Sequence, residues 1–325
     1  MTTFLISTNQ NRQTTFPFVH LAVSRKVRNF ADEMKEYLQL LRPLQWIKNG
    51  FVFAPAFFSN NLLKWEYFVP TFIVFCSFCL ISSSIYCFND LLDIEADRLH
   101  PKKCLRPIAS GKISKRGGYT MMLICLIGAF TLLAFVNSVN TPYLYMMISG
   151  YWLMNIAYCL KLKQFAILDV TIIAIGFVMR VLTGGLATDI WVSHWLVMMT
   201  FLITLFLALS KRNDDYRIYE QTGIKPRVSI TGYNKSFINE ATAIVASVTM
   251  VSYIMYTMSE DVIARMGSRY VYLTSGWVLA GLLRYLQNMI VLGLSGSPTK
   301  SLVKDHFIQL CIIGWILSFF AIIYL

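Results

Sequence analysis

Long apolar stretches recur along the chain, and they constrain its fold more than any other feature. Nine segments of about 18–25 mostly apolar residues are each long enough to cross roughly 30 Å of bilayer hydrocarbon as a helix. They lie at 44–63, 67–88, 119–136, 142–160, 166–187, 193–210, 236–258, 270–292 and 306–325. The first is the weakest, because Lys48, Asn49 and Pro55 interrupt it. The sequence therefore predicts an all-α polytopic membrane protein with nine transmembrane helices.

Composition excludes the main alternatives to a membrane protein. Hydrophobic residues make up 56% and charged residues 14% of the 325 residues, whereas a soluble domain is nearer one quarter charged. A soluble enzyme, a disordered chain and a basic nucleic-acid-binding domain are therefore excluded, and no nucleic acid partner is expected. Residues 1–40 form a polar tail, in which 26–41 could fold as an amphipathic helix on the membrane surface, and 41–325 form the transmembrane domain.

The distribution of Lys and Arg predicts how the chain crosses the membrane. With the N-terminus in the cytoplasm, 23 of the 29 Lys and Arg residues lie in segments expected inside, and three lie in outside connections. An excess of Lys and Arg marks cytoplasmic loops. We therefore expect a multi-pass protein of the cell membrane with its N-terminus inside and its C-terminus outside. The same bias explains much of the net charge of +12 without any ligand.

An acidic motif follows the second predicted span. In Asn89-Asp90-x-x-Asp93-x-x-x-Asp97, the aspartates are three and four residues apart, so a continuing helix would place all three on one face. Like charges at the carboxyl end of a helix are unfavourable unless a cation neutralises them. Oxygen ligands suit Mg²⁺, which bridges carboxylates to substrate phosphates. The alternative is a solvated helix end that pairs with neighbouring Lys and Arg.

Basic residues surround this motif in the predicted cytoplasmic loops. The first loop continues with Arg98, Lys103 and Arg106, and the second begins Ser210-Lys211-Arg212-Asn213-Asp214-Asp215. A metal site beside many cationic side chains is explained if a polyanion lies between them, with Mg²⁺ holding one part of a diphosphate and the Lys and Arg groups the rest. For any single Lys, positive-inside bias alone is the alternative.

Polar and ionisable residues within the spans, or beside their ends, are functional candidates by default. They are Lys48 and Asn49 in the broken first span, Arg180 deep in the fifth span, and Tyr158, Lys161 and Lys163 around a short cytoplasmic connection. Asp169 is expected to pair with Lys163 or Arg180, either as a structural pair or in substrate binding. Gly176, Gly184 and Gly185 are expected to permit close helix packing.

Together these motifs resemble the UbiA-type membrane transferase superfamily, for which the aspartate motif is specific. Further stretches resemble its decaprenyl-phosphate phosphoribosyltransferase branch, and the resemblance covers roughly residues 40–325. These stretches are Arg42-Pro-Leu-Gln-Trp-Ile-Lys48-Asn49, Asp97-Arg98-x-His100-Pro101-x-Lys103 with Arg106-Pro107, Tyr158-x-x-Lys161-x-Lys163, Arg180-x-x-x-Gly184-Gly185 and Ser210-Lys211-Arg212.

The resemblance implies a nine-helix enzyme with a central cavity that faces the cytoplasm. It implies Mg²⁺ as cofactor, phosphoribosyl pyrophosphate as donor and a polyprenyl phosphate as acceptor, with a product used in lipid-linked sugar synthesis for the cell envelope. The implied metal ligands are Asn89, Asp90, Asp93, Asp97 and Asp215, the last preferred over Asp214 by spacing. Catalytic roles fall on Asp90, Asp93, Lys48 and Tyr158. Substrate-binding roles fall on Lys48, Asn49, Arg98, Lys103, Arg106, Tyr158, Lys161, Arg180, Lys211 and Arg212.

The main alternative is a prenyltransferase that moves a prenyl group from a prenyl diphosphate to an aromatic or isoprenoid acceptor. It shares the fold and the first motif. Prenyl-transferring relatives carry widely spaced aspartates where this chain has Lys211-Arg212-Asn213-Asp214-Asp215, which favours the phosphoribosyl branch. A transporter or scaffold is disfavoured, because we find no convincing internal repeat. The sequence leaves open the acceptor's chain length and whether the chain forms a homo-oligomer.

Overall fold

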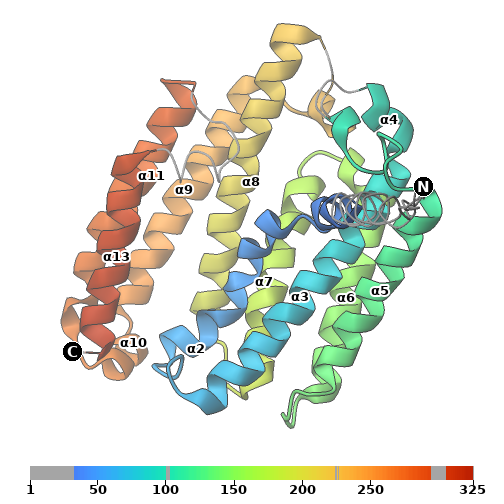
Figure 1. The fold of residues 1–325 in the computed structure, drawn as a ribbon. Coiled ribbons are helices and arrows are strands. Elements are labelled where there is room, and N and C mark those ends of the chain that lie inside the picture. The colour runs from blue at the N-terminus through green and yellow to red at the C-terminus, as the bar shows by residue number, and fades with distance from the viewer. Residues whose placement is uncertain (1–32, 100–102, 224, 226, 294–304, 325) are drawn as a thin grey trace, which may run out of the picture.

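A computed structural model describes residues 33–99, 103–223, 225, 227–293 and 305–324, and within them every regular element is helical. The longer helices are α3 (Trp65–Leu92), α5 (Lys115–Leu133), α6 (Thr141–Leu160), α7 (Leu168–Thr188), α8 (His194–Thr222), α9 (Lys235–Met258), α11 (Ser275–Ile290) and α13 (His306–Tyr324). They form one bundle, with α3, α5, α6 and α7 on one side, α9, α11 and α13 on the other, and α8 between the two groups (Figure 1).

Five of these helices are long and apolar enough to cross a membrane, and they are α3, α5, α7, α8 and α9. A further shorter apolar stretch covers His306–Ile322. The all-helical prediction is confirmed for the described residues. The physical reason is that lipid offers backbone polar groups no hydrogen-bond partner, so a chain in the membrane must satisfy them within a helix or a closed barrel. The count of nine crossings and the direction of each crossing stay predictions.

The first predicted span, 44–63, differs most from a straight membrane helix. It contains a 3₁₀ segment, η1 (Pro43–Phe53), followed by the short α2 (Ala54–Phe58). Long 3₁₀ runs are uncommon and often mark a functional position. The backbone of η1 packs directly against α7 at Gly184. A Cβ atom added at Gly184 would lie 2.0 Å from the carbonyl oxygen of Val52. The prediction that Gly184 permits close packing is confirmed.

Short polar residues define where several helices begin. Ser114 accepts a hydrogen bond from the backbone of Gly117 at the start of α5, and Ser193 caps α8 in the same way. Asn234 caps α9. These side chains satisfy backbone N–H groups that have no partner within the helix. At its other end α8 stops at Gly223, which adopts a left-handed conformation at φ 68°.

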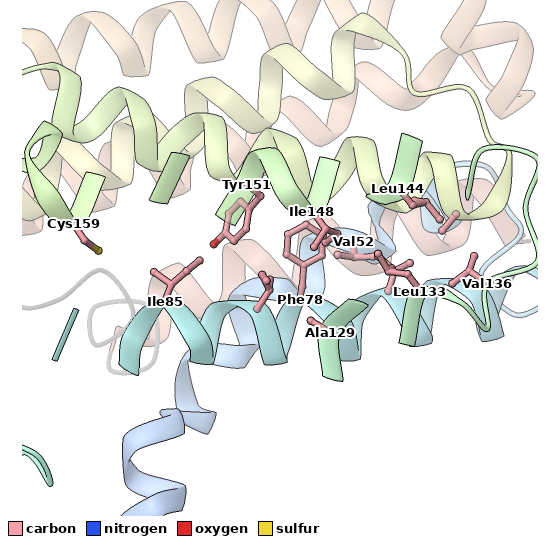
Figure 2. Packing of buried hydrophobic residues seen from close by; sticks show 13 residues of the cluster. Val52, Phe78, Ile85, Ala129, Leu133, Val136, Leu144, Ile148, Tyr151 and Cys159 are labelled. Carbon is pink, nitrogen blue, oxygen red and sulfur yellow. The ribbon is translucent and has the colours of Figure 1, made fainter. Parts of the chain in front are cut away.

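The largest apolar cluster lies between α3, α5, α6 and α7 and fixes the end of α3. Phe78 and Ile85 of α3 face Ile148 and Tyr151 of α6 in this cluster (Figure 2). Cys159, near the end of α6, belongs to the same cluster. Burial of these side chains stabilises the pairing of the helices. It therefore fixes the positions of the polar residues that follow them in the chain.

Short elements occupy the two ends of the bundle. One end of the bundle holds α4 (Ile94–Leu99) and three short 3₁₀ segments in the connecting loops, η2 (Lys103–Leu105), η3 (Leu162–Gln164) and η4 (Val228–Gly232). The other end, near α2, holds α10 (Glu260–Met266) and η5 (Arg269–Thr274) (Figure 1). Residues 33–41 are helical, which covers part of the predicted helix at 26–41. The rest of that helix, the tail 1–32, and the motif residues His100 and Pro101 lie outside the described residues.

Candidate functional site

The carboxyl end of α3 brings acidic and basic side chains together. Arg42, just before η1, donates from Nη2 to Oδ1 of Asp90 at 2.5 Å. Nη1 of Arg106 donates to the same oxygen at 3.1 Å and to Oδ2 of Asp97 at 2.6 Å. Asp90 and Asp97 are each 2% exposed. Two arginines from segments far apart in the sequence therefore neutralise two buried carboxylates.

The helix is interrupted at Asp93, contrary to the expectation of one continuous helix. α3 ends at Leu92, α4 begins at Ile94, and Asp93 is the C-cap residue at φ −93° and ψ 13°. The carboxylate of Asp93 accepts from Nζ of Lys163 at 2.9 and 3.1 Å. Asn89, one turn earlier, is partly buried, and its carbonyl accepts from the backbone N–H of Asp93. Asp93 therefore has a partner of its own, whereas Asp90 and Asp97 share Arg106.

The residues of this motif match a divalent cation in ligand type, but each carboxylate is already paired. Among the described residues, no three His, Cys, Asp or Glu side chains are gathered closely enough to hold a metal ion. Carboxylate and amide oxygens are nonetheless the ligands that Mg²⁺ takes in proteins. A metal-binding state therefore requires Asp90, Asp93 and Asp97 to release some of the Arg and Lys groups that now contact them.

A second charged cluster lies where α7 begins and the apolar part of α8 ends. Nε of Arg212 lies 2.9 Å from Oδ2 of Asp169, and Nη1 of Arg212 donates to Oδ2 of Asp215 at 2.5 Å. The side chains of Arg212 and Asp169 are both 0% exposed. Ser229 and Tyr233 donate to Asp169 at 3.0 and 2.7 Å. The prediction that Asp169 pairs with Lys163 or Arg180 is therefore wrong, and Arg212 is a buried structural partner as placed here.

Arg227, which precedes η4, connects this cluster to α6. Its Nε lies 3.2 Å from Oδ2 of Asp215, and its Nη1 donates to the hydroxyl of Tyr158 at 3.2 Å. The Arg227 side chain remains 30% exposed. Tyr158 therefore lies beside the loop between α8 and α9, and Asp215 pairs with two arginines.

Arg180 is a buried residue of α7, and its guanidinium donates hydrogen bonds to other groups of the protein. Its Nε donates to Asn49 at 2.8 Å, its Nη2 to the hydroxyl of Tyr151 at 2.7 Å and its Nη1 to the carbonyl of Gly176 at 2.7 Å. The guanidinium also lies over the rings of Tyr151 and Phe78, at 4.8 and 5.4 Å from their centroids. In this arrangement, Arg180 and Asn49 hold η1 against α7.

The remaining predicted cations divide into two groups. Lys48, Lys103 and Lys211 are partly buried and electrostatically coupled to the two clusters. Burial, and then the neighbouring Arg106, lower the pKa of Lys103 below its usual value. Arg98 is exposed and donates from Nε to the carbonyl of Ala109 at 3.1 Å, and Lys161 is exposed at the end of α6. Arg98 and Lys161 thus contribute less to the clusters than the other cations.

The sequence analysis gives Arg42 and Arg227 no site role, and it gives Lys163 and Asp169 only as candidates without the partners that the structure shows. Arg42 and Lys163 each fall within a quoted motif, so their positions carried a usable signal. Asp169 stands out in the sequence as an acid in a predicted span, but its partner Arg212 is on another helix and is not indicated by spacing. Arg227 lies in a polar loop with no periodicity, and no sequence signal distinguishes it from its neighbours.

An apolar cavity of about 500 Å³ lies between α2, α8, α9, α11 and α13. Its walls are mainly aromatic and aliphatic, and among its lining residues are Phe58, Trp195, Phe206, Trp277 and Trp315. Such a cavity suits an apolar ligand. On α8 its lining ends at Leu207, four residues before Lys211, so the cavity and the charged clusters are close along one helix.

Curated proteins similar to this chain over most of its length are transferases by name. Decaprenyl-phosphate phosphoribosyltransferase of Mycolicibacterium smegmatis is 32% identical over 298 residues, which cover 88% of this chain and 92% of the relative. The protein of that name from Corynebacterium glutamicum is 28% identical over 300 residues, covering 92% of this chain and 89% of the relative. The one from Mycobacterium tuberculosis is 29% identical over 287 residues, covering 86% and 91%.

Solved structures show the same fold. A UbiA homolog from Archaeoglobus fulgidus bound to GPP and Mg²⁺ matches with a TM-score of 0.64 at 19% identity, covering 89% of this chain and 100% of that one. The same homolog bound to DMAPP and Mg²⁺ matches with a TM-score of 0.65, also at 19% identity, covering 89% and 99%. The family model described as the UbiA prenyltransferase family matches residues 51–297. On this match and on the fold, the chain belongs to the UbiA prenyltransferase family.

Proposed function

We propose that this chain transfers the 5-phosphoribosyl group from phosphoribosyl pyrophosphate to a polyprenyl phosphate and releases diphosphate. The main support for this proposal is that buried carboxylates and many cations from separate loops meet at one end of a bundle that also holds an apolar cavity. Such a site fits a strongly anionic donor beside a lipid acceptor. The names of the relatives, which match over most of their length, support the same reaction.

The chain is a multi-pass membrane protein in this proposal, with nine crossings and residues 41–325 as its transmembrane domain. The N-terminus is cytoplasmic and the C-terminus outside, as the excess of Lys and Arg in the predicted inner loops favours. The charged clusters then open toward the cytoplasm, where a soluble sugar donor is available. The apolar cavity lies within the membrane part of the bundle.

Mg²⁺ is proposed to bind at the aspartate motif, held by Asn89, Asp90, Asp93 and Asp97, with Asp215 as a further ligand. When bound there, Mg²⁺ neutralises the charge of the leaving diphosphate. The cations that now pair with these carboxylates, Arg42, Arg106 and Lys163, are then available to the same diphosphate. Exchange of partners within the cluster keeps the buried charge balanced when the donor binds.

In the transfer step, an oxygen of the lipid phosphate attacks C1 of the ribose as the C1–O bond to diphosphate breaks. The attacking phosphate is already ionised near neutral pH, so the chain needs no strong general base. Lys48 and Tyr158 lie on opposite sides of the site, on η1 and α6, and would orient the reacting groups. Lys103, Arg106 and Lys211 would bind the donor's phosphates. Positioning and charge neutralisation supply most of the rate.

Arg180, Asn49 and Arg212 support this site rather than bind the donor directly. Each is buried and contacts other protein groups. Arg98 and Lys161 bind substrate only at its periphery, since both are exposed. The polyprenyl chain of the acceptor enters the apolar cavity, which places its phosphate toward the charged end of α8.

The experiment supplies purified full-length protein with Mg²⁺, a polyprenyl phosphate and either labelled phosphoribosyl pyrophosphate or labelled prenyl diphosphate. Label from phosphoribosyl pyrophosphate should enter the lipid fraction, and chelation of Mg²⁺ should stop it until the metal is restored. Transfer from prenyl diphosphate alone, with none from phosphoribosyl pyrophosphate, would refute the proposal and establish a prenyltransferase.

A further inference from the structure

Arg227 lies at the proposed site but belongs neither to the aspartate motif at 89–97 nor to the Lys211-Arg212 stretch. It follows the end of α8 and lies against two groups of the proposed site, the hydroxyl of Tyr158 and the carboxylate of Asp215, each at 3.2 Å. Its guanidinium carries a permanent charge and five donors in a planar fork, which fits a phosphate group. With 30% of the side chain exposed, Arg227 remains accessible to a ligand from the water side.

The segment that carries Arg227 is anchored to the bundle. Two residues beyond it, Ser229 donates to Asp169, and Tyr233 donates to the same carboxylate. Ile230 is 0% exposed and packs with Tyr233 and Ile238. These contacts fix the backbone that follows Arg227, so its side chain starts from a defined position. A preorganised cation loses less conformational entropy when it binds an anion.

The charges around Arg227 differ from those around the aspartate motif. In the motif, Asp90, Asp93 and Asp97 have contacts with three cations. Near Arg227, the cations Lys103 and Lys211 lie within electrostatic range, and the two carboxylates in range, Asp215 and Asp169, are both shared with Arg212. Partly buried positive charge in excess is unfavourable unless an anion accompanies it. This half of the site is therefore complementary to a second anionic group.

Two sources could supply that group, because a phosphate monoester occurs both at C5 of the sugar donor and at the head of the lipid acceptor. The structure favours the sugar. Asp215, the partner of Arg227, lies eight residues beyond Leu207, the last cavity-lining residue on α8, which is about 12 Å along the helix. Arg227 thus contacts α8 about two helical turns beyond the last residue that lines the cavity, on the side away from the cavity.

We propose that Arg227, with Tyr158, Lys103 and Lys211, forms a subsite for the 5-phosphate of the donor, and that Arg227 makes the enzyme selective for a phosphorylated sugar. This inference rests on the proposed function. A prenyl diphosphate has no second anionic group, so the subsite would also discriminate against that class of donor. Arg227 acts by binding the remote phosphate and takes no part in bond breaking.

The test compares wild type with Arg227→Ala and Arg227→Lys, using three probes on the purified full chain. Ribose 5-phosphate carries only the proposed subsite ligand, pyrophosphate with Mg²⁺ carries only the leaving group, and farnesyl phosphate represents the lipid head. Loss of a charge-assisted hydrogen bond should weaken the Kd for ribose 5-phosphate about tenfold or more in Arg227→Ala. The Kd for pyrophosphate should stay within about twofold, and Arg227→Lys should recover part of the loss.

Measurements of turnover test the same inference independently of the binding measurements. In Arg227→Ala, kcat/KM for phosphoribosyl pyrophosphate should fall, while kcat/KM for ribose 1-diphosphate, which lacks the 5-phosphate, should not change. Arg116→Ala is the matched control, because Arg116 is an exposed arginine at the start of α5. Its Kd for every probe should equal that of wild type.

Each other outcome overturns the inference in a recognisable way. Equal weakening of ribose 5-phosphate and pyrophosphate would mean that Arg227 supports the fold of the whole site. Weakening of farnesyl phosphate alone would assign Arg227 to the lipid head, and unchanged values would remove it from the site. Failure of the proposed function differs from all of these, since wild type itself would then transfer no phosphoribosyl group.

Discussion

Replacing Asp169 by Asn tests whether the buried charges at the start of α7 stabilise the fold. The Asp169 side chain is 0% exposed and lies 2.9 Å from the guanidinium of Arg212, which is also 0% exposed. Asn keeps the shape but removes the charge, so Arg212 is left with Asp215 alone. Removing one partner of a buried ion pair costs about 3–5 kcal/mol, and we expect the lower end, about 3 kcal/mol, because Asp215 remains.

The free energy of unfolding would be measured on purified protein in mixed micelles by titration with a denaturing detergent. Arg212→Gln should cost a similar amount, and the double variant should cost clearly less than the sum of the two singles. Lys112→Met is the control, since Lys112 forms an exposed pair with Glu36 and its side chain is 56% exposed. That change should cost no more than about 1 kcal/mol.

The result that would refute this reasoning is a small effect of both single variants. If Asp169→Asn and Arg212→Gln each changed stability by less than about 1 kcal/mol, the pair would behave as a surface salt bridge. Strict additivity in the double variant would also contradict it, because charges in direct contact are expected to couple.

Three further predictions address other parts of the molecule. Gly184→Ala should lower the yield of folded protein, because its Cβ would lie 2.0 Å from a backbone oxygen of η1, whereas Gly50→Ala, with nothing within 4 Å, should not; thermal unfolding of both variants checks this. Burial lowers the pKa of Lys103, so its positive charge is lost as pH rises, at a lower pH than for an ordinary lysine; KM for the donor should therefore rise on the alkaline side, and Lys103→Arg should flatten that rise. Asp90→Ala and Asp93→Ala should abolish turnover while membrane insertion is unchanged, and full activity in both would remove the metal proposal.

Much of the helical layout could be predicted from hydropathy, because an apolar stretch in lipid must satisfy its own backbone. The predicted span 67–88 lies within α3, and 142–160 lies within α6. The first span could not be predicted in detail. Polar Lys48 and Asn49 signalled an irregularity, but its 3₁₀ form depends on the contact with α7 at Gly184 and Arg180.

The candidate site was predictable in residue type but not in pairing. The acidic motif was visible because carboxylates at a helix end are unusual, yet at the break in the helix Asp93 pairs with Lys163, whereas Asp90 and Asp97 share Arg106. Which cation meets which acid depends on how helices pack, and local spacing carries no information about it. Arg212 illustrates this point, since the sequence suggested a substrate ligand and the structure buries it against Asp169.

The length of α8 has a consequence for how the two substrates meet. Its 29 residues span roughly 43 Å, whereas the hydrocarbon layer is roughly 30 Å thick. In the proposed membrane arrangement, residues 211–222, which carry the polar end of α8, extend to the depth of the lipid headgroups. The two proposed substrates, a lipid phosphate and a water-soluble sugar phosphate, would then meet there without the lipid being drawn out of the bilayer. Turnover should consequently depend on bilayer thickness, and it should fall in membranes of longer acyl chains that bury this overhang.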